Sequence, residues 1–390
     1  MRIFSILFLI ALQIVSAQTA ITTVGILPTE VSESSGLIYF NNHLITHNDS
    51  DNTAQLFELD TLTREIIRTV KIVNAVNQDW EAITQDETYI YIGDFGNNLG
   101  LRKDLRIYRI LKTDFLRSNS VTAAIINFSY EDQTDFTNTG NSDWDTESFF
   151  VLKDHFILLT KQWKSLGTVA YKLPISLGTH SAVRYDETTN LGLVTDVTFN
   201  ENDDSILLVG YSSFLLPFAK LYTLTEDDKL FSNTATTISL NVGFAQIEGV
   251  AVGENNCYYF TSEYFSRQMP SIVSEARLFK KKIEEVEEVA EGNLDEKEIE
   301  EGVATENMPR SAAPNLSIYK DIASGQIGYR IQNANNYKNT SVYNINGQKV
   351  WELVDKANWE EGFIVPLQNA VYYFVVNLEN LTLTKPFLMY

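Results

Sequence analysis

Hydrophobic and polar positions alternate in short runs along most of this chain, and that pattern is typical of β-strands rather than helices. Between residues 21 and 283 the runs form a unit of strands that recurs at intervals of roughly fifty residues. Each copy begins with an acidic residue beside an apolar strand. A second strand ending in polar residues follows, and then a third. The acidic residues that begin the five copies are Glu33, Glu81, Glu147, Asp196 and Glu248.

Repeats of this length are typical of the four-stranded blades of a β-propeller. The first four copies have a fourth strand and the fifth has none, whereas an unassigned strand at residues 21–27 precedes the first copy. Pairing that strand with the last copy would close the ring and remove its exposed edges. The sequence therefore predicts an all-β fold containing a five-bladed β-propeller closed by its N-terminal strand. Six blades and an open β-sandwich remain as alternatives.

The chain divides into four predicted regions. Residues 1–17 have the basic start, apolar run and small residues of a secretory signal peptide. Residues 18–283 form the β-propeller, and residues 284–312 form an acidic linker. Residues 313–390 form a small C-terminal β-sandwich, since they contain alternating strands and a hairpin signal at Asn346-Gly347. No stretch after the signal peptide has the length and apolar character of a transmembrane segment.

Composition excludes several classes of function. The 390 residues include 51 Asp and Glu against 30 Lys and Arg, a net charge of −21 that disfavours binding to nucleic acid. A single cysteine, Cys257, excludes a disulfide framework and a cysteine-rich zinc or iron–sulfur site. The motifs of serine hydrolases, zinc proteases and phosphate-binding loops are missing from the sequence.

The propeller geometry predicts where a site would lie. The first strand of each blade lines the central channel and its neighbour runs antiparallel, so the start of one and the end of the other share a face. The five leading acids are therefore expected to converge at one channel mouth, with the loops after the second strands around them. Loops on a rigid scaffold commonly carry binding residues. The candidate ligand-binding residues are His47, Asn48, Asp49, Asp94, Asn97, Asn98, Arg102, Lys161, Trp163, Tyr211 and Glu263.

Carboxylates gathered at one mouth repel each other unless a cation compensates them. A divalent cation such as calcium prefers oxygen ligands of this kind, so the candidate metal ligands are Glu33, Glu81, Glu147, Asp196 and Glu248. Alternatively, these side chains accept backbone hydrogen bonds at the strand starts, or pair with Lys161 and Arg102. His47 is the candidate general base because it stands beside Asn48 and Asp49.

Four runs carry a family resemblance: Glu33-Ser-Ser-Gly-Leu, His47-Asn-Asp-Ser, Asp79-Trp-Glu-Ala-Ile and Tyr91-Ile-Gly-Asp-Phe-Gly-Asn-Asn. They resemble secreted Bacteroidetes-type β-propeller proteins and are distantly similar to esterase-like phytase and gluconolactonase-type propellers. In the lactonase-type members a Glu, an Asn and an Asp of the central channel bind a divalent metal, and Glu33 matches that Glu by position. Those relatives usually have six blades.

The C-terminal region resembles the C-terminal sorting domain of the type IX (Por) secretion system. The resemblance rests on Pro314-Asn-Leu-Ser-Ile-Tyr, Val342-Tyr-Asn-Ile-Asn-Gly-Gln-Lys-Val and Ala370-Val-Tyr-Tyr-Phe-Val-Val. The usual Tyr-Pro-Asn-Pro start is Ala-Pro-Asn-Leu in this chain. The resemblance implies passage through the periplasm to the cell surface or beyond, with the type IX machinery as the partner of residues 313–390.

Two functions are consistent with these patterns. The first is an exported β-propeller that acts as a ligand-binding or interaction module. The second is a divalent-metal-dependent hydrolase of esters, lactones or phosphoesters, with its site at the channel mouth.

Overall fold

The computed structural model describes two parts of the chain. The first is residues 20–283, apart from 139, 213–214, 226–228 and 269–270. The second is residues 315–389, apart from 321–325, 335–336, 345–348, 354–358, 365–369 and 379–381. The predicted signal peptide (1–17) and acidic linker (284–312) lie outside the described residues and stay predictions.

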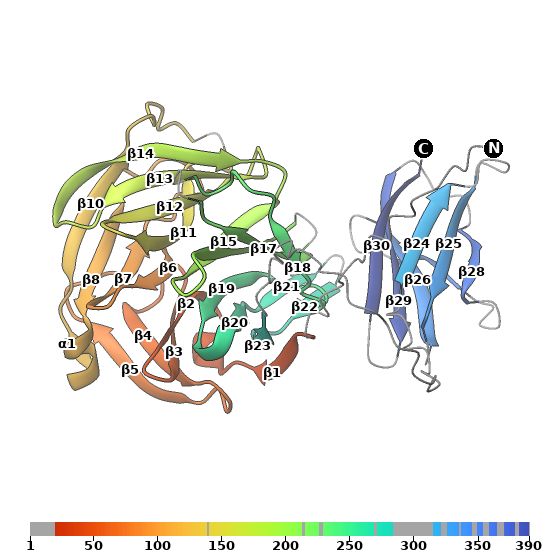
Figure 1. Ribbon diagram of the computed structural model, residues 1–390, viewed down its shortest axis with the longest axis horizontal. Coiled ribbons are helices and arrows are strands. Elements are labelled where there is room, and N and C mark those ends of the chain that lie inside the picture. The colour runs from red at the N-terminus through yellow and green to blue at the C-terminus, as the bar shows by residue number, and fades with distance from the viewer. Residues whose placement is uncertain are drawn as a thin grey trace, which may run out of the picture.

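The first part is a five-bladed β-propeller, as predicted (Figure 1). The innermost strands, one from each blade, are β2 (Ser34–Phe40), β6 (Trp80–Gln85), β11 (Asp145–Leu152), β15 (Leu193–Asn200) and β19 (Ile247–Val252). Each innermost strand contacts those of the two neighbouring blades, so the five strands form a complete ring. This ring excludes the open β-sandwich and leaves no place for a sixth blade.

Each blade continues outward as an antiparallel meander. Blade 1 adds β3 (His43–Asn48), β4 (Gln55–Asp60) and β5 (Ile66–Ile72), with β9 (Ser120–Val121) at its edge. Blade 2 adds β7 (Tyr89–Asp94), β8 (Arg106–Leu111) and β10 (Ala124–Tyr130), and blade 3 adds β12 (His155–Lys161), β13 (Thr168–Pro174) and β14 (Gly178–Thr188). Blade 4 adds β16 (Ser205–Tyr211), β17 (Pro217–Thr223) and β18 (Thr236–Ile238).

Blade 5 joins the two ends of the propeller. It contains β19, β20 (Cys257–Ser262), β23 (Arg277–Lys282) and the N-terminal strand β1 (Thr22–Ile26). β1 pairs antiparallel with β23, with Thr22 opposite Lys280, which confirms the predicted closure. The Arg64 guanidinium of blade 1 donates hydrogen bonds to the carbonyls of Val24 (2.9 Å) and Ile26 (3.1 Å). The outermost strand of blade 5, β1, is therefore also bound to blade 1.

Apolar side chains fill the space between neighbouring blades, because alternate residues of each strand face the adjacent sheet. Trp80 is fully buried between blades 1 and 2, where its ring centroid lies 5.8 Å from that of Tyr108. Between blades 2 and 3, Tyr91 and Phe156 meet edge to face with ring centroids 4.8 Å apart. These contacts fix the angle between blades and therefore the shape of the channel mouth.

Some features were not predicted from the sequence. β14 extends beyond the predicted residues 181–185, and its first half pairs in parallel with β10, so the outer edges of blades 2 and 3 form one sheet. Short elements also follow some strands: the helices η1 (Thr29–Val31), α1 (Lys112–Arg117) and η2 (Glu254–Asn256), and the hairpin of β21 (Phe265–Gln268) and β22 (Ser271–Ser274). The longest helix among the described residues is α1, with six residues, and none has the length or apolar character to span a membrane.

The second part is a small β-sandwich. One sheet contains β24 (Asn315–Lys320), β25 (Ile327–Gln332) and β28 (Glu361–Phe363). The other contains β27 (Lys349–Glu352), β26 (Tyr337–Asn344), β29 (Ala370–Leu378) and β30 (Thr382–Met389). The two sheets share one core, in which the rings of Tyr329 and Phe374 lie 4.5 Å apart. The predicted turn at Asn346-Gly347 lies outside the described residues.

Candidate metal centre at the channel mouth

A β-bulge begins every innermost strand and determines which side chains reach the channel mouth. Where each innermost strand pairs with the second strand of its blade, the register shifts by one extra residue. A bulge turns the extra side chain away from the regular alternation of the strand. The five bulged residues are Gly36, Glu81, Glu147, Thr195 and Glu248.

The leading acids of blades 1 and 4 are therefore not the bulged residues of their strands, although burial raises the pKa values of Asp49 and Glu263 and Glu33 lies close enough for its charge to raise them further. In blade 1 the bulged residue is Gly36, with a φ of 76°, and a Cβ atom there would lie only 2.7 Å from the backbone nitrogen of Ile83. Glu33 lies three residues earlier, is exposed, and accepts a hydrogen bond of 2.6 Å from Asn52 Nδ2. In blade 4 the bulged residue is Thr195, whose hydroxyl donates to the carbonyl of Ile247.

Asp196 accepts backbone hydrogen bonds, which was the alternative to metal binding in the sequence analysis. Its carboxylate accepts hydrogen bonds from the backbone nitrogen of Val197 (2.8 Å) and from that of Val250 in the next blade (2.7 Å). Burial raises the pKa of Asp196 well above its usual value, and the two N–H groups oppose that rise. Asp196 therefore links blades 4 and 5.

We expect Asp196→Asn to destabilise the propeller by about 1–3 kcal/mol, because the amide can satisfy only one of the two N–H groups through its oxygen. Thermal unfolding with and without calcium measures this effect. The midpoint should fall equally in both conditions. A loss of any calcium-dependent stabilisation would instead assign Asp196 to the metal centre.

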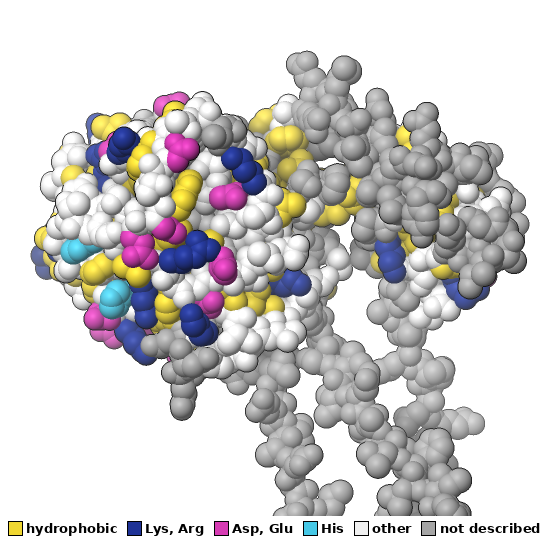
Figure 2. Space-filling model, turned by 90° about the horizontal axis from the view of Figure 1, so that it is seen from above, with side chains coloured by type: hydrophobic (Ala, Val, Ile, Leu, Met, Phe, Trp, Pro, Cys, Tyr) yellow, Lys and Arg dark blue, Asp and Glu magenta, His cyan; other side chains and the backbone are white. Residues whose placement is uncertain are grey.

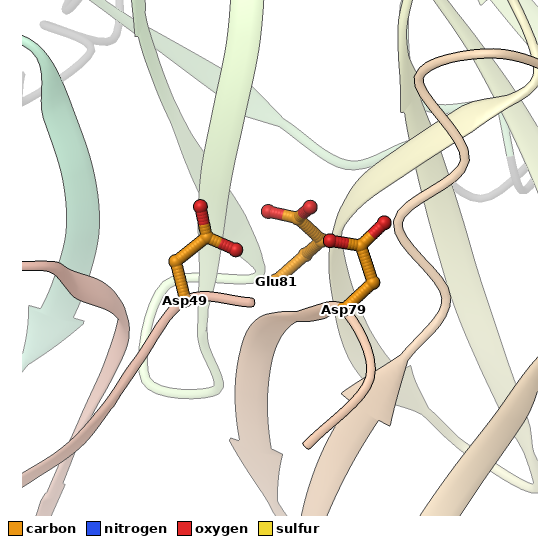
Figure 3. Close-up of side chains that lie close together, drawn as sticks. All are labelled: Asp49, Asp79 and Glu81. Atoms are coloured by element: carbon orange, nitrogen blue, oxygen red, sulfur yellow. The ribbon is translucent and has the colours of Figure 1, made fainter. Parts of the chain in front are cut away.

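Three carboxylates form what we call the outer triad: Asp49, Asp79 and Glu81 (Figure 3). Asp49 follows β3, Asp79 precedes β6, and Glu81 is the bulged residue of β6. One oxygen from each residue lies within 4.8 Å of the other two, and Figure 3 shows the carboxylates directed toward a common space. Asp49 and Asp79 are half-buried, whereas Glu81 is only 5% exposed. The outer triad therefore has a buried base and an open side.

Backbone hydrogen bonds hold the loops of the outer triad in place. The Asn77 side chain donates to the carbonyls of Asn48 (3.0 Å) and Asp49 (2.7 Å) and accepts a bond from the backbone nitrogen of Trp80 (3.0 Å). The loop after β7 also donates to the carbonyl of Asp79, through Phe95 and the residue that follows it. Blades 1 and 2 thus position these carboxylates before any ligand binds.

Gly96 is required by the close approach of two of these carboxylates. A Cβ atom at this position would lie 2.2 Å from Oε1 of Glu81 and 2.5 Å from Oδ2 of Asp79. We expect Gly96→Ala to displace both carboxylates and to weaken calcium binding at least tenfold, measured by calorimetric titration. The melting midpoint of the variant in chelator is the control. A large fall in that midpoint would mean that the variant disrupts the fold rather than the site.

A second group, the inner triad, consists of Glu81, Asp145 and Glu147, all of them buried. Their ligand oxygens also lie within 4.8 Å of one another. Glu147 pairs with Lys161 at 3.1 Å. Asp145 accepts hydrogen bonds from the backbone nitrogen of Asn97 (2.6 Å) and from Trp163 Nε1 (2.8 Å). Unlike the outer triad, this group is partly neutralised by the protein itself.

Burial and mutual repulsion raise the pKa values of the acids at the mouth. Burial, followed by the charge of Asp49, raises the pKa of Asp79 to about 7, and burial raises that of Glu248 to about 7. Burial and the charge of Glu248 raise the pKa of Glu263 to about 9. The pKa of Glu81 rises well above its usual value, because of burial first and then the charges of Asp49 and Glu147.

Glu81 has no compensating partner within the described part of the chain. No lysine or arginine there lies within ion-pair distance of its carboxylate, and only acidic neighbours act on its charge, although the residue is only 5% exposed. A charged carboxylate in a largely buried side chain, beside other acids and without a compensating charge, is costly. A bound cation would satisfy Glu81 and both triads to which it belongs.

His47 does not lie on the rim of the mouth, so the predicted general base is not supported. It is fully buried, with its ring edge-on to Trp80 at 5.5 Å, and its Nδ1 lies 3.0 Å from the carbonyl of Asn48. Burial lowers the pKa of His47 to about 4, so the ring is neutral at ordinary pH. Packing between blades 1 and 2 explains this residue.

The other predicted ligand-binding residues lie on the same face, and most have structural partners. Asp94 is buried and pairs with Arg102 at 2.8 Å, and Arg102 donates its backbone N–H to Asn97 Oδ1 at 2.9 Å. Asn98 is exposed. The Tyr211 hydroxyl accepts a bond of 3.1 Å from Gln246, and Lys161 lies 4.9 Å from the centroid of the Trp163 ring.

Asp79 was missed in the sequence analysis, although a signal for it was present. It stands two residues before Glu81, and residues two apart in a strand lie on the same face. Asp145 has the same relation to Glu147 in blade 3. This pair of acids marks the mouth in blades 2 and 3, whereas blades 1, 4 and 5 do not have it.

The surface away from this mouth has a different character. A cavity of about 400 Å³ opens at the opposite end of the channel, where the innermost strands end, and is lined in part by Phe40, Lys112 and Glu201. On the face seen in Figure 2, acidic and basic side chains are interspersed.

Comparisons with known proteins show no family for this chain. No family model matches it, and no curated protein matches it. Among solved structures, it is similar to a chain of the mitotic checkpoint complex, at 11% identity and a TM-score of 0.31, over 64% of this chain and 61% of that one. It therefore spans about three fifths of that relative. It is also similar to a Thermus thermophilus protein described as a putative oxidoreductase (glucose dehydrogenase), at 9% identity and a TM-score of 0.37, over 67% of this chain and 99% of that one.

Proposed function

We propose that the propeller is a ligand-binding module that depends on one divalent cation, of the calcium type, bound by Asp49, Asp79 and Glu81. The observation that carries this proposal is Glu81, a largely buried carboxylate without a compensating charge among the described residues that is directed toward two further carboxylates. The three donors are all carboxylate oxygens, which hard cations prefer. Because the outer triad is open on one side, the cation would keep positions free for a ligand.

Thermal unfolding of the full chain tests this proposal. A cation that binds only the folded state stabilises it by RT ln(1 + [L]/Kd), or about 2.7 kcal/mol when its concentration is one hundred times the dissociation constant. We expect calcium to raise the midpoint above that measured in chelator. An unchanged midpoint with calcium, magnesium and manganese would refute the metal centre.

We also propose that the chain is exported and that residues 313–390 direct it through the type IX secretion machinery. The signal-peptide pattern of residues 1–17 and the resemblance of the C-terminal region support this proposal. Deleting residues 313–390 should retain the chain in the periplasm of a host with that machinery. Release of the truncated chain at the normal level would contradict the sorting role.

A metal-dependent hydrolase is the second candidate function, and the open side of the outer triad favours it. A cation held there could polarise a carbonyl or phosphoryl oxygen of a substrate. His47 cannot serve as the base because it is buried against Trp80. Chromogenic esters, lactones and phosphoesters, assayed with calcium and with chelator, test this candidate. Activity that survives chelation would argue against it.

A further inference from the structure

Two potential cation positions share Glu81 at the channel mouth. The outer triad contains Asp49, Asp79 and Glu81, and the inner triad contains Glu81, Asp145 and Glu147. A carboxylate with two oxygens can bridge two metal ions, which in two-metal sites lie about 3.5–4 Å apart. On donor geometry alone, the mouth could therefore hold one ion or two.

Lys161 distinguishes the two triads. Its ammonium group lies 3.1 Å from Oε2 of Glu147, and both side chains are more than nine-tenths buried. At this distance the ammonium group compensates the charge of Glu147 directly. In the outer triad, by contrast, no lysine or arginine of the described chain lies within ion-pair distance of a carboxylate.

The surroundings of Lys161 hold its ammonium group beside the inner triad. The rings of Trp163 and Tyr211 lie 4.9 and 5.6 Å from Nζ, and such contacts favour a cation at that point. Trp163 in turn donates to Asp145, so the ring that packs on Lys161 also fixes a member of the inner triad. Lys161 is therefore held by a salt bridge and by two aromatic rings, and it is not a mobile surface side chain.

We propose that Lys161 takes the place of a second divalent cation, so that the mouth binds one ion at the outer triad instead of two ions bridged by Glu81. This inference rests on the proposed function, because it presumes that the outer triad binds a cation. A single positive charge already compensates Glu147, and an ion entering the inner triad would meet that charge at close range. Removing Lys161 should therefore open a second site for an ion of the same class.

The number of bound calcium ions in the full chain tests this inference, by calorimetric titration and native mass spectrometry. The wild-type chain should bind one ion and Lys161→Gln should bind two. Lys161→Arg keeps the charge and should bind one. The double variant Lys161→Gln/Glu147→Gln removes both members of the ion pair, and it should also return to one ion because a ligand of the inner triad is lost.

Folding of the variants gives a second readout. Lys161→Gln leaves Glu147 uncompensated, so this variant should be destabilised in chelator and should gain more from calcium than the wild-type chain. Two ions in the wild-type chain, or one ion in folded Lys161→Gln, would overturn the inference. Failure of Lys161→Gln to fold in millimolar calcium, while the double variant folds, would overturn it as well. A wild-type chain that binds no cation would instead refute the proposed function.

Discussion

Replacing Glu81 with glutamine is expected to abolish the stabilisation of this protein by calcium. Glu81 belongs to both triads, so the substitution removes a charged ligand from each. For a wild-type chain stabilised by about 2.7 kcal/mol, the midpoint should rise by about 5–10 °C, given about 2–4 °C per kcal/mol for a domain of this size. The midpoint of Glu81→Gln should not change with calcium, as followed by circular dichroism or calorimetry.

The stability of Glu81→Gln in chelator tests whether the Glu81 carboxylate destabilises the metal-free protein. Glutamine is nearly isosteric with glutamate and removes a buried, unpaired charge, so the metal-free variant should be at least as stable as the metal-free wild type at pH 8. Glu201→Gln is the matched control, because Glu201 is an exposed glutamate at the opposite end of the channel. That control should keep the full calcium response. A calcium response in Glu81→Gln equal to that of the wild type would show that the ion does not bind at this mouth.

The stability of the metal-free protein is expected to fall as pH rises from about 5 to 9. Folding raises the pKa values of Asp79 and Glu248 to about 7 and that of Glu263 to about 9, from ordinary values of 3.8 for Asp and 4.5 for Glu. Between the unfolded and folded values the native state holds more protons than the unfolded state. The free energy of unfolding therefore decreases with pH in that window. One unit of pKa corresponds to about 1.4 kcal/mol, so the total effect is on the order of several kcal/mol.

Calcium should oppose this dependence, because at the outer triad it replaces the proton on Asp79. The increase in midpoint on adding calcium should be small at pH 5 and largest near pH 9. Binding should also release protons, which titrations in two buffers of different ionisation enthalpy would detect. An equal calcium response at pH 5 and pH 9, with no proton release, would contradict the assignment of Asp79 to the cation.

The sequence predicted the propeller because its signal is periodic. Five copies of an alternating strand pattern, with one strand missing at the end and one spare at the start, leave few ways to close the sheet. Pairing between blades has no such signal. β10 and β14 pair in parallel across two blades, and nothing in either strand distinguishes this partner from a blade edge exposed to solvent.

The candidate site was predicted less well, because bulges are not visible in the sequence. An error of one residue moves a strand's side chains to the other face. The alignment of leading acids was off by one residue in blade 4, where Thr195 and not Asp196 is bulged. In blade 1 it was off by three residues, because Gly36 and not Glu33 is bulged. Glu81, Glu147 and Glu248 are the bulged residues of their strands, and their role as metal ligands stays a prediction. Asp79 and Asp145 were missed, since the repeat was matched on a single acid per copy.

The pairing of β1 with β23 also determines when the protein can finish folding, because the two strands come from opposite ends of the propeller sequence. Thr22 emerges from the ribosome among the first residues, whereas its partner Lys280 is made only after all five repeats. Most strands of blades 1 to 4 pair with near neighbours in sequence, although β9 completes the edge of blade 1 only after β8 of blade 2, and the ring stays open until blade 5 is complete. A nascent chain arrested before residue 277 would therefore carry an unpaired first strand, a natural point of recognition for chaperones.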